Sequence, residues 1–299
     1  MKLYGVFKNR VKPGWVFSQN GNMWRFVFAG RHAIAGETRD TEKNILYIFA
    51  LNTLTGNTYI KNYLFENGNY RIAIEGANSS MIFLNRFDNP ELPYHKNIIA
   101  LDIHTGRKLW EHGEYNYFFC TEDKLYGIKQ KFESAEFAEL DMIDGSVVCV
   151  FPETQNSFIY GLKKKSDEEL FDENVNYPCD WNPSDNDLNT GENECISGII
   201  RKEIENKDNK GAVEYVRKDN LIIFNYYIPA GTDVKDINRM FYRNILCVYD
   251  ISGSEKLFED ILNDKSNFNV PDNFFTRDNI LYYLREKKEI VCVNLANIP

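Results

Sequence analysis

Several motifs of the common enzyme classes are missing from this sequence of 299 residues. It contains no P-loop, GxGxxG, GxSxG or HExxH motif, so nothing supports a nucleotide-binding protein, a serine hydrolase or a zinc protease. Its six cysteines form no CxxC pair and show no zinc-site spacing, and its four histidines stand apart in the chain. The sequence therefore predicts neither a cofactor nor a bound metal.

Long apolar runs are also missing. Residues 1–21 contain basic side chains but no apolar run long enough for a signal peptide, and no later segment is long enough to span a bilayer. We therefore expect a cytoplasmic protein that does not bind membranes. Cys149, Cys247 and Cys292 lie in strand-like apolar runs, and we expect them to be buried, reduced thiols.

An excess of basic residues, which a nucleic-acid-binding surface needs, is absent as well. The net charge is −9, and residues 166–209 hold 13 acidic and 3 basic residues, so the remainder of the chain is close to neutral. This distribution disfavours nucleic acid as a partner. Residues 166–194, rich in Asp, Glu and Asn, are expected to form a solvated acidic insertion that the fold does not need.

What the sequence does contain is a repeated frame of two short strands joined by a turn. In its best copy, Ala100–Trp110, a strand runs into Asp102, the chain reverses at Thr105 and Gly106, and a second strand ends on Trp110. Asp accepts hydrogen bonds from backbone N–H groups of such a turn, and Gly adopts the positive φ that the reversal needs. Two strands of this kind are half of a four-stranded antiparallel blade. Weaker copies lie at residues 50–60, 139–149 and 248–258, and the start of another lies at 292–294.

The frame Ala-x-Asp-x-x-Thr-Gly-x-x-x-Trp resembles the tryptophan-docking repeat of quinoprotein-like (PQQ-repeat) β-propellers. In that family the last aromatic residue packs onto the neighbouring blade. The resemblance gives this role to Trp110, with Ile60, Cys149 and Phe258 as weaker substitutes. The exported leader, vicinal cysteine pair and calcium-binding acidic set of the quinone-dependent members have no match here. The resemblance therefore implies a bacterial branch of the superfamily without the quinone site.

The spacing of these copies predicts an all-β fold, a β-propeller of about six four-stranded antiparallel blades within a range of five to seven. We expect one domain over residues 1–299 and no long helix. Ser157–Lys163 and Cys195–Ile204 are expected to be strands of a degenerate fourth blade that the acidic insertion interrupts. Leu3–Phe7 is expected to supply the missing strand of the last blade and so to close the ring.

The strand with the most charged side chains suggests a ligand site. Glu37 and Arg39 are two residues apart and share one face of this strand, whereas Asp40 points the other way or enters the loop. Arg86 and Asp88 take the corresponding places in the next blade. These five residues are predicted to line a rim that binds an anionic or polar ligand. The alternative is that they form ion pairs between blades.

Without a catalytic motif, the sequence predicts a non-catalytic propeller scaffold, a monomer that binds a protein partner or a small polar ligand. The alternative is a propeller enzyme that acts on a small polar or sugar-like substrate at the rim of its channel. A scaffold predicts a large exposed aromatic or charged patch. An enzyme predicts two carboxylates, or a carboxylate and a histidine, that meet in a pocket.

Overall fold

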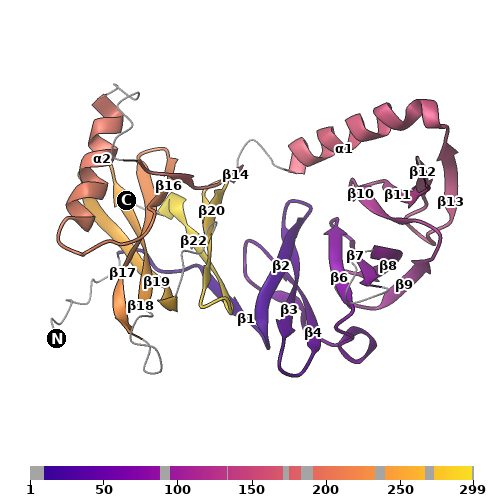
Figure 1. The fold of residues 1–299 in the computed structure, drawn as a ribbon, viewed down its shortest axis with the longest axis horizontal. Helices are drawn as coiled ribbons and strands as arrows, with labels where there is room; N and C mark the ends of the chain where they lie inside the picture. Colours follow the sequence, from indigo (N-terminus) through magenta and orange to yellow (C-terminus); the bar gives the residue numbers. More distant parts are fainter. Residues whose placement is uncertain are drawn as a thin grey trace. The chain divides into compact units, whose positions relative to one another are not determined.

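The chain folds mainly into antiparallel β-sheets (Figure 1). Five sheets of four or five strands are present among the described residues, and these divide into two compact units. We call Ser18–Glu173 the three-blade unit, and Met1–Phe17 with Asn174–Pro299 the two-blade unit. No helix in the described part of the chain is long and apolar enough to cross a membrane. The computed structural model describes residues 10–87, 95–132, 134–170, 175–182, 191–232, 240–266 and 273–297.

The three-blade unit contains three consecutive four-stranded sheets, in each of which the strands follow chain order. This up-and-down arrangement is the blade of β-propellers, and it confirms the predicted all-β fold class. Blade 1 consists of β2 (Asn22–Ala29), β3 (Ala33–Asp40), β4 (Ile45–Asn52) and β5 (Thr58–Tyr63). Blade 2 consists of β6 (Ile72–Ala77), β7 (Met81–Phe87), β8 (His95–Asp102) and β9 (Lys108–His112). Blade 3 consists of β10 (Asn116–Cys120), β11 (Leu125–Gln130), β12 (Ala135–Leu140) and β13 (Val147–Phe151).

The polar residues of the repeated frame make the turn between the last two strands of a blade. Asp102 Oδ1 accepts hydrogen bonds from the N–H groups of His104 at 3.1 Å and Thr105 at 2.8 Å, and from the Thr105 hydroxyl at 2.8 Å. Gly106 has a φ of 71° and donates its N–H to the Asp102 carbonyl at 2.8 Å. Asn52 binds the corresponding turn of blade 1 in the same way. These residues are therefore structural.

Trp110 docks blade 2 onto blade 3, as the repeat predicts. Its Nε1 donates to the Met142 carbonyl at 2.8 Å, and a Cβ atom at Gly145 would come within 2.5 Å of the indole ring. In blade 1 the ring that lies against the next turn, at Gly106, belongs to Tyr63. Ile60, the predicted substitute, is buried in the apolar core between blades 1 and 2.

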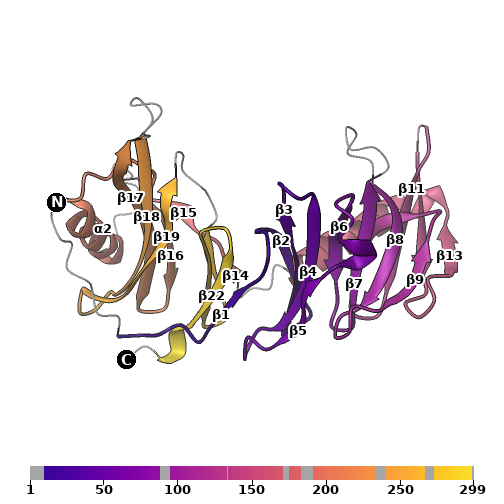
Figure 2. The ribbon, with the colours of Figure 1, turned by 90° about the horizontal axis from the view of Figure 1, so that it is seen from below.

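The two faces of blade 3 are covered by different partners. Figure 2 shows blade 2 beside blade 3. Leu125, Ala138 and Leu140 face blade 2 and form a cluster with Trp110. The alternate residues, which include Tyr126 and Phe137, face the other way, because successive side chains of a strand point to opposite faces. The helix α1 (Asn156–Leu170) covers this second face and buries Ile159 completely.

The two-blade unit contains two five-stranded sheets. Blade 4 has the order β15 (Cys179–Asp180), β16 (Glu214–Lys218), β17 (Leu221–Thr232), β18 (Met240–Asp250) and β19 (Glu255–Ser266). Blade 5 has the order β1 (Trp15–Ser18), β22 (Glu289–Asn294), β21 (Ile280–Arg285), β20 (Phe274–Arg277) and β14 (Val175–Asn176). Five blades fall within the predicted range, one fewer than the six expected. Three short 3-10 helices complete the described elements: η1 (Phe65–Asn67), η2 (Glu153–Gln155) and η3 (Leu295–Asn297).

An N-terminal strand completes the last blade, although it is not the one predicted. β1 lies at the edge of blade 5 beside β22, and the Gly14 N–H donates to the Cys292 carbonyl at 2.8 Å. Leu3–Phe7, which we expected in this place, lies outside the described residues.

The predicted strands of a degenerate fourth blade are helices, so this prediction is wrong. Residues 157–163 belong to α1, and residues 195–204 belong to α2 (Gly191–Ile204). Ile196, Ile199 and Ile200 recur at helical spacing, and α2 packs this stripe against the face of blade 4 that points away from blade 5. The periodicity of 3.6 residues was present in the sequence but is short enough to be taken for a strand.

Residues 175–182 of the acidic segment contribute to the two-blade unit, whereas residues 166–170 belong to α1. β14 pairs with β20 and β15 pairs with β16, so two short pieces of residues 166–194 extend the sheets of blades 5 and 4. Trp181 packs into the core beside α2 and donates from Nε1 to Ser197 Oγ at 3.3 Å. We predicted a solvated insertion that the fold does not need. In contrast, backbone pairing and the packing of Trp181 attach this segment to the two sheets.

The cysteines differ in burial. Cys247 and Cys292 are buried, as predicted, and burial raises the pKa of Cys292 to about 12. Cys149 is exposed, so its predicted burial is wrong. The reason is that Cys149 lies on the face of blade 3 that points away from blade 2, and the described part of the three-blade unit has no further blade to cover it as blade 3 covers Trp110. Phe258, the other predicted substitute for tryptophan, is buried between blades 4 and 5.

Replacement of Trp110 by Ala should lower the free energy of unfolding by about 3–5 kcal/mol, because it leaves a cavity between blades 2 and 3. Trp24→Ala is the matched control, since Trp24 is 62% exposed in the same unit, and it should cost about 1 kcal/mol or less. Chemical denaturation of both variants measures the difference. Equal losses would show that Trp110 is not an anchor.

Candidate functional site

Glu37 and Arg39 form a buried ion pair between blades 1 and 2. Arg39 Nη2 lies 2.8 Å from Glu37 Oε1, and both side chains are almost inaccessible to solvent. Arg39 also donates to the carbonyls of Tyr70 at 3.0 Å and Ile72 at 2.8 Å, and Glu37 Oε2 accepts the Ile74 N–H at 2.7 Å. Burial raises the pKa of Glu37, although Arg39 opposes this shift. The pair therefore connects β3 to β6 of the next blade through hydrogen bonds to the β6 backbone.

Asp40 lies apart from this pair, at the turn after β3. Its carboxylate accepts hydrogen bonds from the Lys43 N–H at 3.0 Å and from Lys43 Nζ at 2.9 Å. These bonds lower the pKa of Asp40. Asp88, its predicted counterpart in blade 2, lies outside the described residues.

Arg86 has its own acidic partners. Its guanidinium forms ion pairs with Glu66 and, at 3.1 Å, with Glu111. Partial burial by itself would raise the pKa of Glu111, but the hydrogen bonds from Arg86 and Lys108 lower it to about 2. The structure thus brings Glu37 and Arg39 together and gives Asp40 and Arg86 separate partners.

A second charged cluster, which the sequence did not suggest, surrounds Glu203 on α2. Lys207 and Lys256 form ion pairs with Glu203 Oε1, the latter at 2.6 Å. The hydroxyl groups of Tyr226 on β17 and Tyr249 on β18 donate to the same carboxylate. One carboxylate therefore holds the helix to three strands of blade 4. Glu203 lies one turn beyond Ile199 and Ile200, so the helical periodicity of α2 was the signal that could have located it.

The pKa values in this cluster are shifted away from neutrality. Burial alone would raise the pKa of Glu203, but hydrogen bonds from Lys207, Lys256 and Tyr249 lower it below its usual value. Burial, assisted by Glu203, raises the pKa of both Tyr226 and Tyr249. Burial opposes the ammonium form of Lys256, yet its acidic neighbours raise the pKa of this lysine. General acid–base catalysis favours groups that titrate near the working pH, so this cluster is not tuned for such a role.

Glu203, Cys247 and Glu259 offer three potential metal ligands within 4.8 Å of one another. Lys256 Nζ already lies 2.6 Å from Glu203 and 2.7 Å from Glu259, so an ammonium group neutralises the two carboxylates. Burial raises the pKa of Cys247, which favours the protonated thiol over the thiolate that binds metals. The donor set therefore fits an ion-pair cluster better than a metal.

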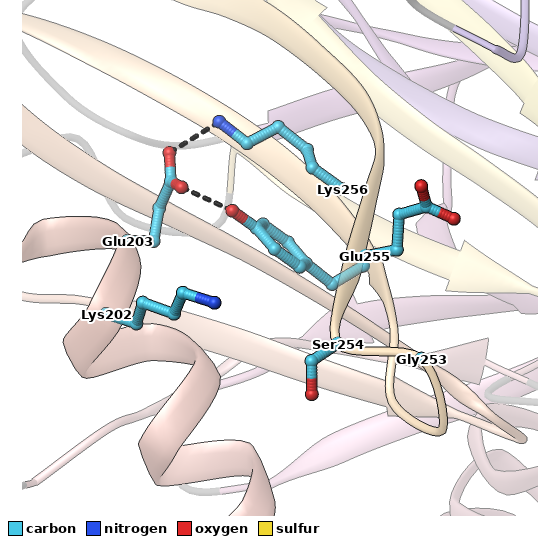
Figure 3. Close-up of a pocket in the computed structure, with 7 residues that line it drawn as sticks. Lys202, Glu203, Gly253, Ser254, Glu255 and Lys256 are labelled. Carbon is cyan, nitrogen blue, oxygen red and sulfur yellow. Dashed lines mark hydrogen bonds and ion pairs between the residues drawn. The ribbon is translucent and has the colours of Figure 1, made fainter.

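A polar pocket of about 470 Å³ adjoins this cluster (Figure 3). Lys202 of α2 lines one side, and Ser254 and Glu255 of the turn between β18 and β19 line the other. Glu203 also lines the pocket, and Figure 3 shows Lys256 Nζ directed at its carboxylate. The Tyr249 hydroxyl donates to the same carboxylate. The pocket can hold a small polar molecule.

A different surface is marked by apolar side chains. Half of the 14 exposed large hydrophobic residues in the described part of the chain lie in blade 3 and α1. All four residues Val147–Val150 of β13 are exposed, and none is charged. We define the β13 surface as Val147, Val148 and Val150 together with Phe158 and Tyr160 of α1. The signal in the sequence is the uncharged run Val147–Phe151, which contains no catalytic motif.

Comparisons with known proteins add little about function. A family model described as a domain of unknown function (DUF4905) matches residues 30–110, about a quarter of the chain. No curated protein matches the sequence.

Solved structures with a similar fold have very low sequence identity. The chain is similar to BamB from Moraxella catarrhalis, with 8% identity, a TM-score of 0.27, and 95% of this chain and 99% of that chain covered. It is similar to the quinohemoprotein alcohol dehydrogenase ADHIIG from Pseudomonas putida HK5, with 9% identity, a TM-score of 0.32, and 94% and 43% covered. For a eukaryotic initiation factor these values are 8%, 0.32, 89% and 53%. This chain thus spans about half the length of the last two proteins, and no activity is transferred from any of the three.

Glu203→Gln tests whether the ionised cluster holds α2 to blade 4. Because the pKa of Glu203 is lowered on folding, its contribution to stability is present above its ordinary pKa of about 4.3 and is lost as the pH falls further. The melting temperature of the variant should be below that of the unaltered protein at pH 7, and this difference should shrink below about pH 4. Glu205→Gln, at an exposed residue just after α2, is the control and should cost little at pH 7. A difference that stays constant with pH would refute this role.

Proposed function

We propose that this chain is a non-catalytic propeller-type scaffold that binds a protein partner through the β13 surface. The observation that carries the proposal is the concentration of exposed apolar side chains on one outer strand and the helix beside it. Val148, Val150, Phe158 and Tyr160 are each at least half exposed. Exposed apolar side chains that gather on one part of a soluble protein mark interaction sites. A partner would remove this area from water.

The charged clusters support a scaffold over an enzyme. Glu37 and Arg39 bind backbone groups of the next blade, and the Glu203 cluster binds α2 to its sheet. In both places the charged atoms already have close partners within the fold. These charged atoms therefore stabilise the packing of one element on another and are not free to bind a reacting group.

The alternative function is an enzyme that acts on a small polar or sugar-like substrate. The pocket beside Glu203 favours it, because two carboxylates and an unpaired Lys202 lie at or near one cavity of suitable size. A further variant of the binding proposal is that a small polar ligand binds at the rim formed by Glu37, Arg39, Asp40, Arg86 and Asp88. It depends on Arg86 and Asp40, since Glu37 and Arg39 are buried.

The remaining features of the proposal come from the sequence. The repeat frame at Ala100–Trp110 supports a place in the quinoprotein-like superfamily, in a branch without a quinone or other cofactor. The composition supports a cytoplasmic monomer that binds neither membranes nor nucleic acid.

Site-specific photocrosslinking in the source cells tests the protein-binding function. A photoreactive phenylalanine analogue replaces Val148, and a second variant carries it at Leu54, an exposed apolar residue in a turn of blade 1. We expect a discrete protein adduct from position 148 and none from position 54, because contact with the partner is confined to the β13 surface. The additional change Val150→Lys should reduce the adduct at least tenfold, since a buried unpaired charge is costly. Equal adducts at both positions, or none at 148, would contradict the proposal.

A further inference from the structure

β13 leaves one row of backbone groups without a neighbouring strand in its sheet. It is the last strand in the order β10-β11-β12-β13, and its register with β12 runs from Phe137 opposite Phe151 to Leu140 opposite Val147. The opposite edge of β13 therefore presents N–H and C=O groups at the spacing of a strand. Such an edge is a template for a further strand.

The outer strands of the other two blades in this unit carry charges that discourage strand addition. β5 contains Lys61, and β9 contains Lys108 and Glu111. Proteins commonly place such charges on exposed edges to prevent pairing with other chains. β13 has the sequence Val-Val-Cys-Val-Phe and lacks this protection.

A groove of about 430 Å³ lies between blade 3 and α1, and its lining runs from Phe119 of β10 to Phe151 at the end of β13. Tyr126 and Phe151 line it from the sheet, and Phe158 and Leu162 line it from the helix. Lys124 and Glu139, an ion pair at 3.0 Å, give it a polar rim. Cys149 is opposite the groove residue Glu139 in the register and so lies on this face, with its side chain exposed.

We propose that β13 accepts an extended apolar segment of a partner protein as an additional strand of blade 3, with one bulky apolar side chain of that segment in the groove under α1. This inference rests on the proposed function and specifies its partner. In strand addition the backbone hydrogen bonds supply affinity, and pockets for alternate side chains supply specificity. β13 provides the open backbone, its uncharged side chains suit an apolar segment, and the groove is the pocket.

Two other occupants fit the geometry less well. A helix would fill the groove but would leave the backbone edge of β13 unpaired. A second copy of this chain would pair β13 with itself. β13 has a bulge at Val148, the extra residue between Val147 opposite Leu140 and Cys149 opposite Glu139. In a symmetric pairing of two β13 strands about Cys149, both strands would carry this bulge, and it would disturb their register.

The test uses the full chain and a fluorescent synthetic peptide, Lys-Thr-Val-Phe-Val-Thr-Lys. As a strand, it presents Phe on one face and two Val residues on the other. Two further peptides carry N-methyl groups on alternate residues, in one phase or in the other. Methylation in either phase removes the N–H donors along one edge of the peptide and leaves every side chain unchanged. Fluorescence anisotropy measures the affinity of the three peptides.

We expect one methylated peptide to lose about tenfold or more in affinity, and the other to stay within about threefold of the parent peptide. Replacement of Phe by Ala in the peptide, or Val148→Lys in the chain, should also cost about tenfold or more, whereas Leu54→Lys should cost nothing. Circular dichroism shows that the chain variants are folded.

Equal binding of the two methylated peptides, or no binding of the parent peptide, would overturn strand addition. If position 148 still forms its protein adduct in that case, the scaffold function stands and only the mode of binding is wrong. Self-association of the chain that Val148→Lys abolishes, seen by sedimentation, would assign the edge to a second copy and would also overturn the inference.

Discussion

The structure depends on one constraint, which is that each β-sheet must have its apolar faces covered. Strands such as β17 place apolar residues on both faces: Ile223 points to blade 5, whereas Ile222 and Phe224 point to α2. Burial of apolar surface stabilises a fold by about 25 cal/mol per Å², so an uncovered face of such a sheet would cost many kcal/mol. Within each unit a neighbouring blade covers one face, and a helix covers the outer face of blade 3 or blade 4.

The same constraint explains where the charges lie. Glu37 with Arg39 and the cluster around Glu203 occupy places where one element is laid over another. A buried charge is tolerated when hydrogen bonds and an opposite charge satisfy it, and the partners here come from the element that is being attached. The result is that buried ion pairs and hydrogen bonds connect neighbouring elements whose other contacts are apolar. For this reason we propose the outer strand β13, rather than a charged pocket, as the part of the described surface that binds a partner.

Much of the fold could be predicted from the sequence, because strand periodicity and turn chemistry are local. Asp102 and Gly106 locate a blade turn without knowledge of the tertiary structure, and Trp110 docks as the repeat implies. The helices α1 and α2 were missed because each contains a short apolar run that also suits a strand. The pairing of Glu37 with Arg39 was one of two predicted outcomes, but their backbone partners on β6 are remote in the sequence. The exposure of Cys149 depends on whether another blade covers its face of blade 3, and composition does not reveal this.

The central claim is that α1 covers the face of blade 3 that points away from blade 2 and forms one wall of the groove. The most direct measurement compares the free energies of unfolding of Ile159→Ala and Ile143→Ala. Ile159 is fully buried under α1, whereas Ile143 is 82% exposed in the turn before β13. Our account predicts a loss of about 2–5 kcal/mol for Ile159→Ala and a loss close to zero for Ile143→Ala. Equal, small losses would show that α1 does not cover the sheet and would remove the basis for the groove.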